Sequence, residues 1–266
     1  MSPAMEAIEF REVRTILGGQ LILDGISFTV RQGEFLCLLG PSGSGKSTTL
    51  RIIGGLLRST SGTVRVLGAP PEEGWRRLAF VFQSPRLLPW RTAMENVVLG
   101  MELRHDDGNP AEMAARARHY LAMVGLAADA GKYPGQLSGG ERQRVALARA
   151  LAVEPEVILM DEPFSALDIN TRERLRDEVI RIWRSTGKTI LFVTHDLDEA
   201  LYLADRVIII SDKPTRVLRT IELGLARPRN LFGDPEIARI RTEMRELFRG
   251  MKGMGEVLGE EGGEAR

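Results

Sequence analysis

The fold is decided by the stretch Gly40-Pro41-Ser42-Gly43-Ser44-Gly45-Lys46-Ser47, which fits the phosphate-binding pattern GxxxxGK[ST]. An apolar run over residues 35–39 precedes it and a helix-like run over residues 48–56 follows it, as a strand–loop–helix unit requires. The glycines let the backbone curl with its N–H groups inward, and the amino end of the next helix adds to this nest for phosphate oxygens. Lys46 can place its charge on the β- and γ-phosphates, and the Ser47 hydroxyl can ligate Mg²⁺. The alternative is a Gly/Ser-rich turn without a ligand, which the flanking strand and helix disfavour.

Composition and charge exclude several classes of protein. The 266 residues include 36 basic and 36 acidic side chains, so no basic surplus indicates nucleic-acid binding. No apolar run approaches the roughly 18–20 residues that cross a bilayer, and residues 1–6 hold no signal-peptide core. The single cysteine, Cys37, lies in the apolar run before the loop, where we expect a small buried side chain. We expect a cytoplasmic protein, or one held at a membrane by a partner.

Strand and helix signals alternate along most of the chain. Apolar runs predict strands over 8–13, 25–30, 34–39, 62–67, 78–82, 157–160, 189–193 and 207–210, with a turn at Gly18-Gly19. Helices are predicted over 109–124, 138–154, 170–185 and 235–248, and after Asp196. This alternation predicts an α/β fold with a mostly parallel sheet covered on both faces.

The predicted domain organisation is an α/β core over 8–86 and 156–225 with a helical lobe, residues 87–155, inserted into it. A helical extension over 226–249 follows. Residues 250–266 are rich in Gly and Glu, and we expect them to be disordered.

Four polar side chains at the ends of predicted strands are candidates for chemistry. Asp161 closes an apolar strand and can hold Mg²⁺ beside Ser47, although buried strands that end in an acidic residue are common. Glu162 can orient or deprotonate a water, or it is a solvated carboxylate at a helix start. His195 follows the strand over 189–194 and can reach a γ-phosphate, or it is a structural hydrogen-bonding group. Gln83 can contact Mg²⁺ or water, or it is a polar cap on its strand.

A second anion-binding device occurs at Leu137-Ser138-Gly139-Gly140-Glu141, where two glycines begin a helix. Bare amides, the helix dipole and the Ser138 hydroxyl favour a phosphate there. The two devices lie almost a hundred residues apart. A two-fold dimer lets each nucleotide bind between the first device of one chain and the second device of its partner.

The order of these motifs resembles the ATP-binding subunit of ABC transporters over residues 8–225. The resemblance rests on 40–47, Gln83, 137–141, 157–162, Ser165-Ala166-Leu167-Asp168 and His195, and the element at 137–141 is its most specific part. It implies a P-loop NTPase core of the RecA-like type, an antiparallel β subdomain and the inserted helical lobe.

The resemblance also implies roles for the site residues. The nucleotide would be bound by Gly40, Pro41, Ser42, Gly43, Ser44, Gly45, Lys46, Ser47 and Thr48, and by Ser138, Gly139, Gly140 and Asp168 of the partner. Ser47, Gln83 and Asp161 would hold Mg²⁺. Glu162 would be the catalytic base, with His195 as the switch histidine and Gln83 as the Q-loop residue. ATP and Mg²⁺ are the implied cofactors, and a second copy of the chain is an implied partner. In the family an aromatic side chain stacks on adenine at the position of about Leu17, so the preference for ATP over GTP rests on the resemblance alone.

The segment around Leu87, Leu88 and Trp90 follows Gln83 and resembles the nitrate, sulfonate and taurine importer branch, as does Arg227-Pro228-Arg229. These apolar residues either pack the helical lobe onto the core or line a groove that binds a transmembrane permease subunit. The branch implies permease subunits, an external solute-binding protein and a peripheral location on the cytoplasmic face of the membrane, without nucleic acid.

Two other functions compete with the importer. A soluble ABC-type ATPase of DNA repair or of the ribosome usually has two cassettes, a coiled coil, a zinc hook or a basic arm, and the sequence has none of these. An unrelated P-loop GTPase or kinase leaves residues 137–141 unexplained, and no Asn-Lys-x-Asp guanine motif occurs.

Overall fold

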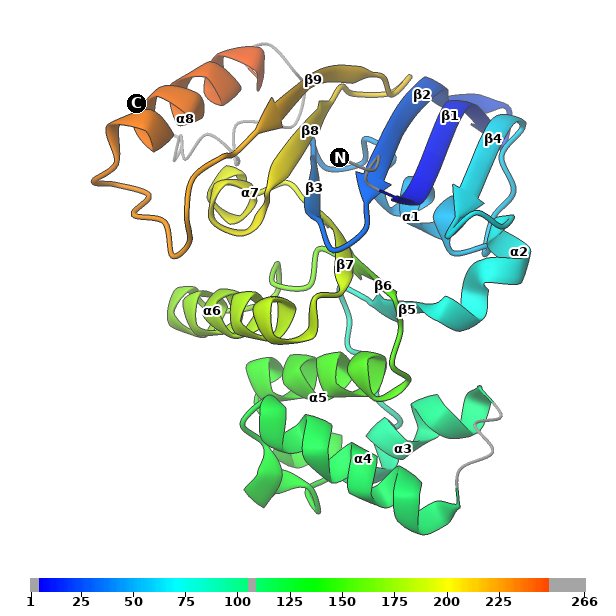
Figure 1. Ribbon diagram of the computed structural model, residues 1–266, viewed down its shortest axis with the longest axis vertical. Coiled ribbons are helices and arrows are strands. Elements are labelled where there is room, and N and C mark those ends of the chain that lie inside the picture. Colours follow the sequence, from blue (N-terminus) through cyan, green and yellow to red (C-terminus); the bar gives the residue numbers. More distant parts are fainter. Residues whose placement is uncertain (1–4, 105–108, 249–266) are drawn as a thin grey trace, which may run out of the picture. The chain divides into compact units, whose positions relative to one another are not determined.

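The structure is a computed structural model that describes residues 5–104 and 109–248 (Figure 1). The chain divides into two units, Met1–Gly74 with Leu191–Arg266, and Trp75–Ile190. Strand β7 (Thr189–Thr194) begins in the second unit and ends in the first. The tail that the sequence predicts to be disordered, residues 250–266, lies outside the described residues. No helix in the described ranges is both long enough and apolar enough to cross a membrane.

The first unit contains an antiparallel sheet of order β2-β1-β4, formed by β1 (Glu6–Leu17), β2 (Gln20–Arg31) and β4 (Ser61–Val66). Gly18 and Gly19 join β1 to β2 with φ of 55° and 80°, a left-handed two-residue turn that favours glycine. The first two strands are longer than predicted and reach the turn on both sides. In β1 the added residues are mostly exposed, whereas in β2 they include Leu21, Ile22 and Leu23, an apolar signal of which Ile22 and Leu23 are buried. This sheet is the antiparallel subdomain that the resemblance implied.

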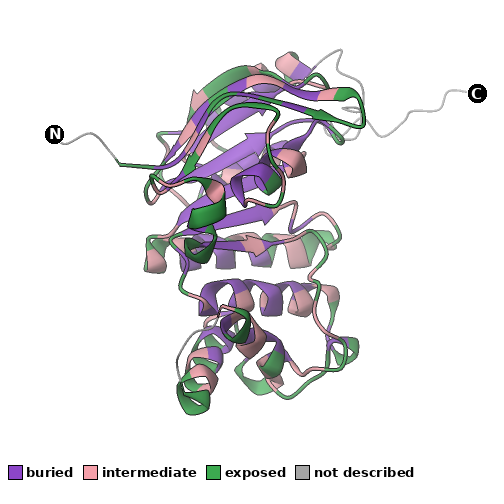
Figure 2. Cartoon of the chain, turned by 90° about the vertical axis from the view of Figure 1, so that its right-hand side faces the viewer, coloured by how far each residue is buried: buried purple, intermediate pink, exposed green. Residues whose placement is uncertain are grey.

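A second set of strands in this unit has the order β7-β3-β8-β9. β3 (Phe35–Leu39) and β8 (Arg206–Ile210) are parallel and every residue of both is buried, as the purple strands of Figure 2 show. β9 (Val217–Glu222) pairs antiparallel with β8. β9 was not predicted, because an edge strand with mostly exposed side chains shows no apolar run.

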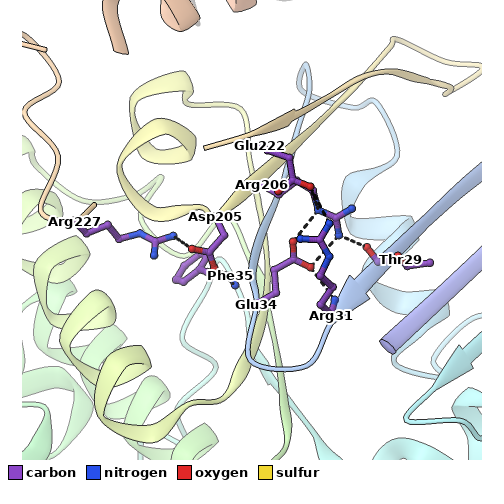
Figure 3. Close-up of polar contacts among 8 residues, drawn as sticks. All are labelled: Thr29, Arg31, Glu34, Phe35, Asp205, Arg206, Glu222 and Arg227. Atoms are coloured by element: carbon purple, nitrogen blue, oxygen red, sulfur yellow. Dashed lines mark hydrogen bonds and ion pairs between the residues drawn. The ribbon is translucent and has the colours of Figure 1, made fainter. Parts of the chain in front are cut away.

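A buried ion pair fastens β8 to the start of β3 (Figure 3). Arg206 Nε donates to Glu34 Oε1 over 2.7 Å and Arg206 Nη2 to Glu34 Oε2 over 2.9 Å, with side chains only 10% and 5% exposed. Arg206 Nη2 also donates to the carbonyl oxygen of Thr29 in β2 over 2.6 Å. The guanidinium therefore joins strands of both sheets in this unit. The helices of this unit are α1 (Lys46–Ile53), α2 (Pro71–Gly74), α7 (Leu197–Leu203) and α8 (Pro235–Phe248).

The second unit pairs β5 (Leu78–Val81) in parallel with β6 (Val157–Asp161). Its helices are α3 (Ala93–Leu103), α4 (Pro110–Met123), α5 (Gly139–Ala152) and α6 (Ile169–Thr186), with 3₁₀ turns at Trp75–Arg77, Ala127–Asp129 and Pro134–Gln136. α3, α4 and α5 pack together within the segment predicted to be a helical lobe. α3 was not individually predicted, although its signal is present: Thr92 and Glu95 form a reciprocal capping box.

Candidate phosphate-binding and catalytic site

Two glycines of the loop between β3 and α1, Gly40 and Gly45, have no room for a side chain. A Cβ at Gly40 would lie 2.5 Å from Ile210 Cγ1, and one at Gly45 would lie 3.0 Å from Leu23 Cδ2. Gly45 has φ of 101° and stands at the N-cap of α1 without a side-chain capping bond. The loop is thus close to β2 and β8, and it ends at a helix amino terminus that no side chain caps.

Lys46 lies inside this loop and is only 3% exposed. Its Nζ donates to the carbonyl oxygens of Gly40 over 2.9 Å and of Pro41 over 2.8 Å. Ser44 Oγ is buried and has no hydrogen-bond partner in the described part of the chain, while the Ser44 carbonyl accepts from Thr215 Oγ1. A buried ammonium, an unsatisfied hydroxyl and an uncapped helix end fit a bound phosphate group.

The other loop residues lie at its outer side. Ser42 and Gly43 are exposed, and Ser47 and Thr48 are half-buried in the first turn of α1. An added Cβ at Gly43 would meet nothing within 4 Å. Glycine at that position is needed for its φ of 78° and not for lack of space.

His195 comes from a strand that lies beside the loop strand, as the sequence predicted. The Gly40 amide donates to the Thr194 carbonyl oxygen over 3.3 Å, so β3 and β7 end at the same edge of the sheet. His195 follows Thr194 directly, and α7 begins two residues later with Asp196 as its N-cap. The side chain of Asp196 accepts from the amides of Asp198 and Glu199 over 2.8 and 3.0 Å.

In the second unit, β5 and β6 pair in register, with Val81 opposite Met160. Gln83, Asp161 and Glu162 therefore leave the sheet at the same edge. Gln83 Nε2 donates to Ser165 Oγ over 3.0 Å, and this hydroxyl donates to the Glu162 carbonyl oxygen over 3.0 Å.

Glu162 itself has a φ of 42°, a left-handed conformation that is uncommon for a residue other than glycine. The sequence predicted no role for Ser165, which is only one of the residues on which the family resemblance rests. Its contacts join two predicted site residues, and the sequence carries no pattern that predicts this link.

The Ser-Gly-Gly element forms the start of α5 as a capping box, as predicted. Ser138 Oγ accepts from the Glu141 amide over 3.2 Å, and Glu141 Oε2 accepts from the Ser138 amide over 2.7 Å. The hydrogen bond from the Ser138 amide is the main reason that the pKa of Glu141 lies below its ordinary value. Ser138 remains exposed to solvent, so the element is accessible at this end of the helix.

Asp168 is the N-cap of α6, where its Oδ1 accepts from the Thr171 amide over 3.0 Å. Hydrogen bonds from Thr171 lower the pKa of Asp168. A Cβ at Gly140 would lie 2.3 Å from Thr171 Cγ2, so the starts of α5 and α6 touch at this point. The structure thus brings the Ser-Gly-Gly element close to Asp168.

α5 also holds the segment that follows Gln83. Gln143, 3% exposed, donates to the Phe82 carbonyl oxygen over 3.1 Å. Arg149 donates to the carbonyl oxygens of Pro85 over 2.7 Å and of Arg86 over 2.9 Å. Neither Gln143 nor Arg149 was predicted to matter, because long side chains on a helix do not reveal their acceptors in the sequence.

The cluster after Gln83 is a turn with an exposed aromatic side chain. Buried Asn96 of α3 accepts from the Leu88 amide over 2.8 Å, and its Nδ2 lies 3.0–3.1 Å from the carbonyl oxygens of Leu88, Arg91 and Thr92. Leu87 and Leu88 are half-buried, whereas Trp90 is 71% exposed. Packing within the lobe therefore does not account for Trp90.

The predicted site residues form two groups, one in each unit. The loop over 40–48 and His195 belong to the first, and Gln83, Ser138, Gly139, Gly140, Asp161, Glu162 and Asp168 belong to the second. No cluster of three or more His, Cys, Asp or Glu side chains suited to a metal occurs among the described residues.

Comparison with known proteins decides which family this arrangement represents. The family model described as "ABC transporter" matches residues 23–165, which is more than half of the chain. The chain belongs to the ABC transporter family. Its members include the bicarbonate transport ATP-binding protein CmpD of Synechocystis sp., which is 42% identical over 232 residues, 86% of this chain and 82% of that protein. The aliphatic sulfonates import ATP-binding protein SsuB 3 of Nocardia farcinica is 44% identical over 238 residues, 90% of this chain and 89% of that protein.

A solved ABC structure agrees with the fold. The ATP-binding cassette MJ0796, in a dimeric post-hydrolysis state bound to ADP and Pi, matches with a TM-score of 0.72 at 35% identity, over 82% of this chain and all of that one. The α/β fold with an antiparallel β subdomain is therefore that of an ABC ATPase cassette, as the sequence predicted. The chain is accordingly an ATPase of this family.

Proposed function

We propose that the chain is the ATP-binding and ATP-hydrolysing subunit that energises an ABC importer for a small solute such as nitrate, bicarbonate, a sulfonate or taurine. The observation that carries the proposal is the loop over 40–47, with its buried Lys46 and the uncapped start of α1. Relatives of 41–44% identity named for nitrate, bicarbonate, sulfonate and taurine import give the substrate class.

In this proposal the first unit binds the nucleotide. The inward amides of residues 40–48 hold the phosphates, and Lys46 moves its charge from the carbonyl oxygens of Gly40 and Pro41 onto them. Leu17, 38% exposed at the end of β1, offers adenine an aliphatic surface without aromatic stacking.

Ser47, Gln83 and Asp161 supply the oxygens for Mg²⁺, which neutralises phosphate charge when bound. Glu162 accepts the proton of the attacking water, and His195 orients that water or the γ-phosphate. The left-handed backbone at Glu162 supports this role, because strained conformations gather at functional sites.

We further propose that two copies form a head-to-tail dimer with two nucleotides. Ser138, Gly139 and Gly140 of one chain would contact the γ-phosphate held by the other, and Asp168 would lie at the interface. The exposure of Ser138 and Asp168 supports this arrangement, as do the dimeric cassettes of 35–36% identity.

The membrane partner in this proposal is a pair of permease subunits that contact the turn carrying Trp90, and an external solute-binding protein delivers the solute to them. Trp90 is 71% exposed, and tryptophan is enriched at protein–protein interfaces. The chain would lie on the cytoplasmic face of the membrane, peripheral through these subunits, and its zero net charge agrees with the absence of nucleic acid.

Glu162→Gln tests the catalytic assignment. The amide keeps the shape but accepts no proton, so we expect unchanged ATP binding, loss of turnover and a trapped dimer in size-exclusion chromatography. Glu154→Gln is the matched control, because Glu154 also has a left-handed φ, 48°, and is exposed away from the site. Normal hydrolysis by the Glu162 variant would remove this residue from catalysis.

Two further variants test the two phosphate-binding devices separately. Lys46→Ala should weaken nucleotide affinity in equilibrium binding, and an unchanged affinity would reject the loop assignment. Ser138→Arg should leave nucleotide binding by a monomer intact but prevent hydrolysis. A chain that stays monomeric and still turns over ATP at full rate would reject the dimer, and co-purification with nucleic acid instead of a membrane protein would reject transport.

A further inference from the structure

α7, the helix that follows His195, is too short to be stable by itself. It has seven residues, and isolated helices of this length are marginal in water. Its amino end is tied to residues on both sides of His195. Asp196 caps it, and Thr194 Oγ1 donates to Glu199 Oε2 over 2.6 Å, with both Thr194 and Glu199 buried. The position of the backbone at His195 therefore depends on the position of α7.

Arg229, from the C-terminal extension, binds the carboxyl end of α7. Its Nη1 donates to the carbonyl oxygens of Leu201 and Ala204, each over 2.7 Å, and its Nη2 to those of Leu223 and Leu225, each over 3.0 Å. The residue is 5% exposed. Burial lowers the pKa of Arg229 to about 10, so the guanidinium is charged at neutral pH. A cation at this end of a helix satisfies carbonyl groups that have no partner within the helix and complements its dipole.

A second arginine of the extension reaches the first turn of the same helix. Arg241 of α8 lies with its Nη2 2.8 Å from Asp198 Oδ1. α8 contacts α7 (Figure 1), and its side chains Ile237, Ile240, Met244 and Phe248 are buried. The C-terminal extension thus holds α7 at both ends, with Arg229 at one and Arg241 at the other.

The extension is also tied to the strand that leads into the phosphate-binding loop. Arg227 Nη2 lies 2.8 Å from Asp205 Oδ1, and the other carboxylate oxygen of Asp205 accepts from the Phe35 amide over 2.9 Å (Figure 3). Phe35 is the first residue of β3. The same segment therefore contacts the support of His195 and the base of the loop strand.

We propose that the extension over residues 226–248 is a positioning element for His195, with Arg229 and Arg241 as its positioning residues. It holds α7, and with α7 the backbone at His195, at a fixed place relative to the Gly40 end of the loop. The inference rests on the role proposed for His195 in hydrolysis. It assigns a part in turnover to a segment outside the region that the family model matches.

The test compares Arg241→Met and Arg229→Met with Arg219→Met in the full chain. Arg219 is the matched control, because its Nη2 pairs with Glu243 Oε1 of the same helix over 2.7 Å but joins it to β9. We expect Arg241→Met to lower kcat by about tenfold with unchanged affinity for ATP, since a small displacement of a catalytic group is costly while the loop stays intact. Arg219→Met should leave both values as in the wild type.

Two structural measurements separate positioning from a general loss of stability. Amide hydrogen exchange should show faster exchange in α7 for Arg241→Met and not for Arg219→Met. The imidazole resonances of His195, assigned with a His195→Gln variant among three histidines, should shift in the same variant. Asp198→Asn should reproduce Arg241→Met, and the double variant should be no worse than either single one.

The inference would be overturned if Arg241→Met kept the wild-type kcat and unshifted His195 resonances. If Arg229→Met does not fold, the result for Arg241→Met alone is decisive. Failure of the proposed function looks different: the wild-type chain would then hydrolyse no ATP, or His195→Ala would keep full turnover. Loss of turnover in His195→Ala together with normal turnover in Arg241→Met would reject the positioning role alone.

Discussion

Gln83 and Ser165 are hydrogen-bonded to each other, with Gln83 Nε2 3.0 Å from Ser165 Oγ. The same hydroxyl donates to the Glu162 carbonyl oxygen over 3.0 Å. One serine therefore connects the end of β5 with the end of β6, where the proposed base stands. A change at Gln83 can reach Glu162 through a single side chain.

Replacement of this serine tests the connection. Ser165→Ala removes both bonds, and each is worth about 1 kcal/mol net. We expect a several-fold lower kcat with unchanged KM for ATP, because the phosphate-binding loop is not touched. Steady-state kinetics on the full chain gives both values.

Ser185→Ala is the control for this prediction. Ser185 also donates its hydroxyl to the carbonyl oxygen three residues earlier, over 3.0 Å, but at the far end of α6. The control removes one bond instead of two, so it should lose about half as much stability and keep its kcat. Equal kinetic effects in the two variants would show that the Gln83–Ser165 contact has no part in turnover.

The contact between α5 and α6 predicts a difference between two adjacent glycines. An added methyl group at Gly140 would lie 2.3 Å from Thr171 Cγ2, whereas one at Gly139 has its nearest neighbour at 3.6 Å. Gly140→Ala should destabilise the chain by about 1–3 kcal/mol through overpacking, and Gly139→Ala should be neutral or slightly stabilising in the helix. Urea unfolding measures both, and equal stability of the two variants would contradict the close packing.

The buried pair of Arg206 and Glu34 predicts a large loss on breaking it (Figure 3). Arg206→Met leaves the Glu34 carboxylate buried without its partner, which costs about 3–5 kcal/mol. Glu102→Gln is the control, since Glu102 is 43% exposed and pairs with Arg91 at the surface over 2.8 Å, a contact worth about 0–1 kcal/mol. A similar small loss in both variants, measured by chemical unfolding, would show that the buried pair contributes no more than a surface pair.

Replacement of the buried Glu178 by glutamine should raise the stability of the chain by an amount that depends on pH. Burial raises the pKa of this carboxyl above its ordinary value, and the charges of Arg144 and Arg181 oppose the shift only in part. Because the folded pKa is raised, stability is highest below the ordinary pKa of Glu and falls as the pH rises through the folded value. Glu178→Gln stays neutral, so its Tm should exceed that of the wild type at pH 7–8 and match it near pH 4.

Glu173→Gln on the same helix is the control, because Glu173 is 61% exposed. It should show no gain that grows with pH. A Tm difference for Glu178→Gln that is constant from pH 4 to pH 8 would show that the carboxyl is not destabilised by burial.

The elements with a strong local pattern were predictable. The helices that begin at Asn109, Ser138 and Asp196 are found where the sequence predicted them, since these N-cap residues bond to backbone amides only two or three positions away. The buried strands β3, β6, β7 and β8 were also found, because strands covered on both faces are apolar throughout. β9 was not predicted because it lacks an apolar pattern, and α3 was not predicted although Thr92 and Glu95 have capping-box spacing.

By itself the sequence determined the family and the position of the glycine-rich loop, and it predicted the candidate site residues, because glycine spacing and a neighbouring lysine act through the local backbone. Only the tertiary structure decided what holds those residues in place. Gly40 meets Ile210, Gln83 meets Ser165, and Arg229 meets the carboxyl end of α7, each across a long stretch of sequence. Such contacts are fixed by the packing of whole strands and helices, and no local pattern records which partner a long side chain will find.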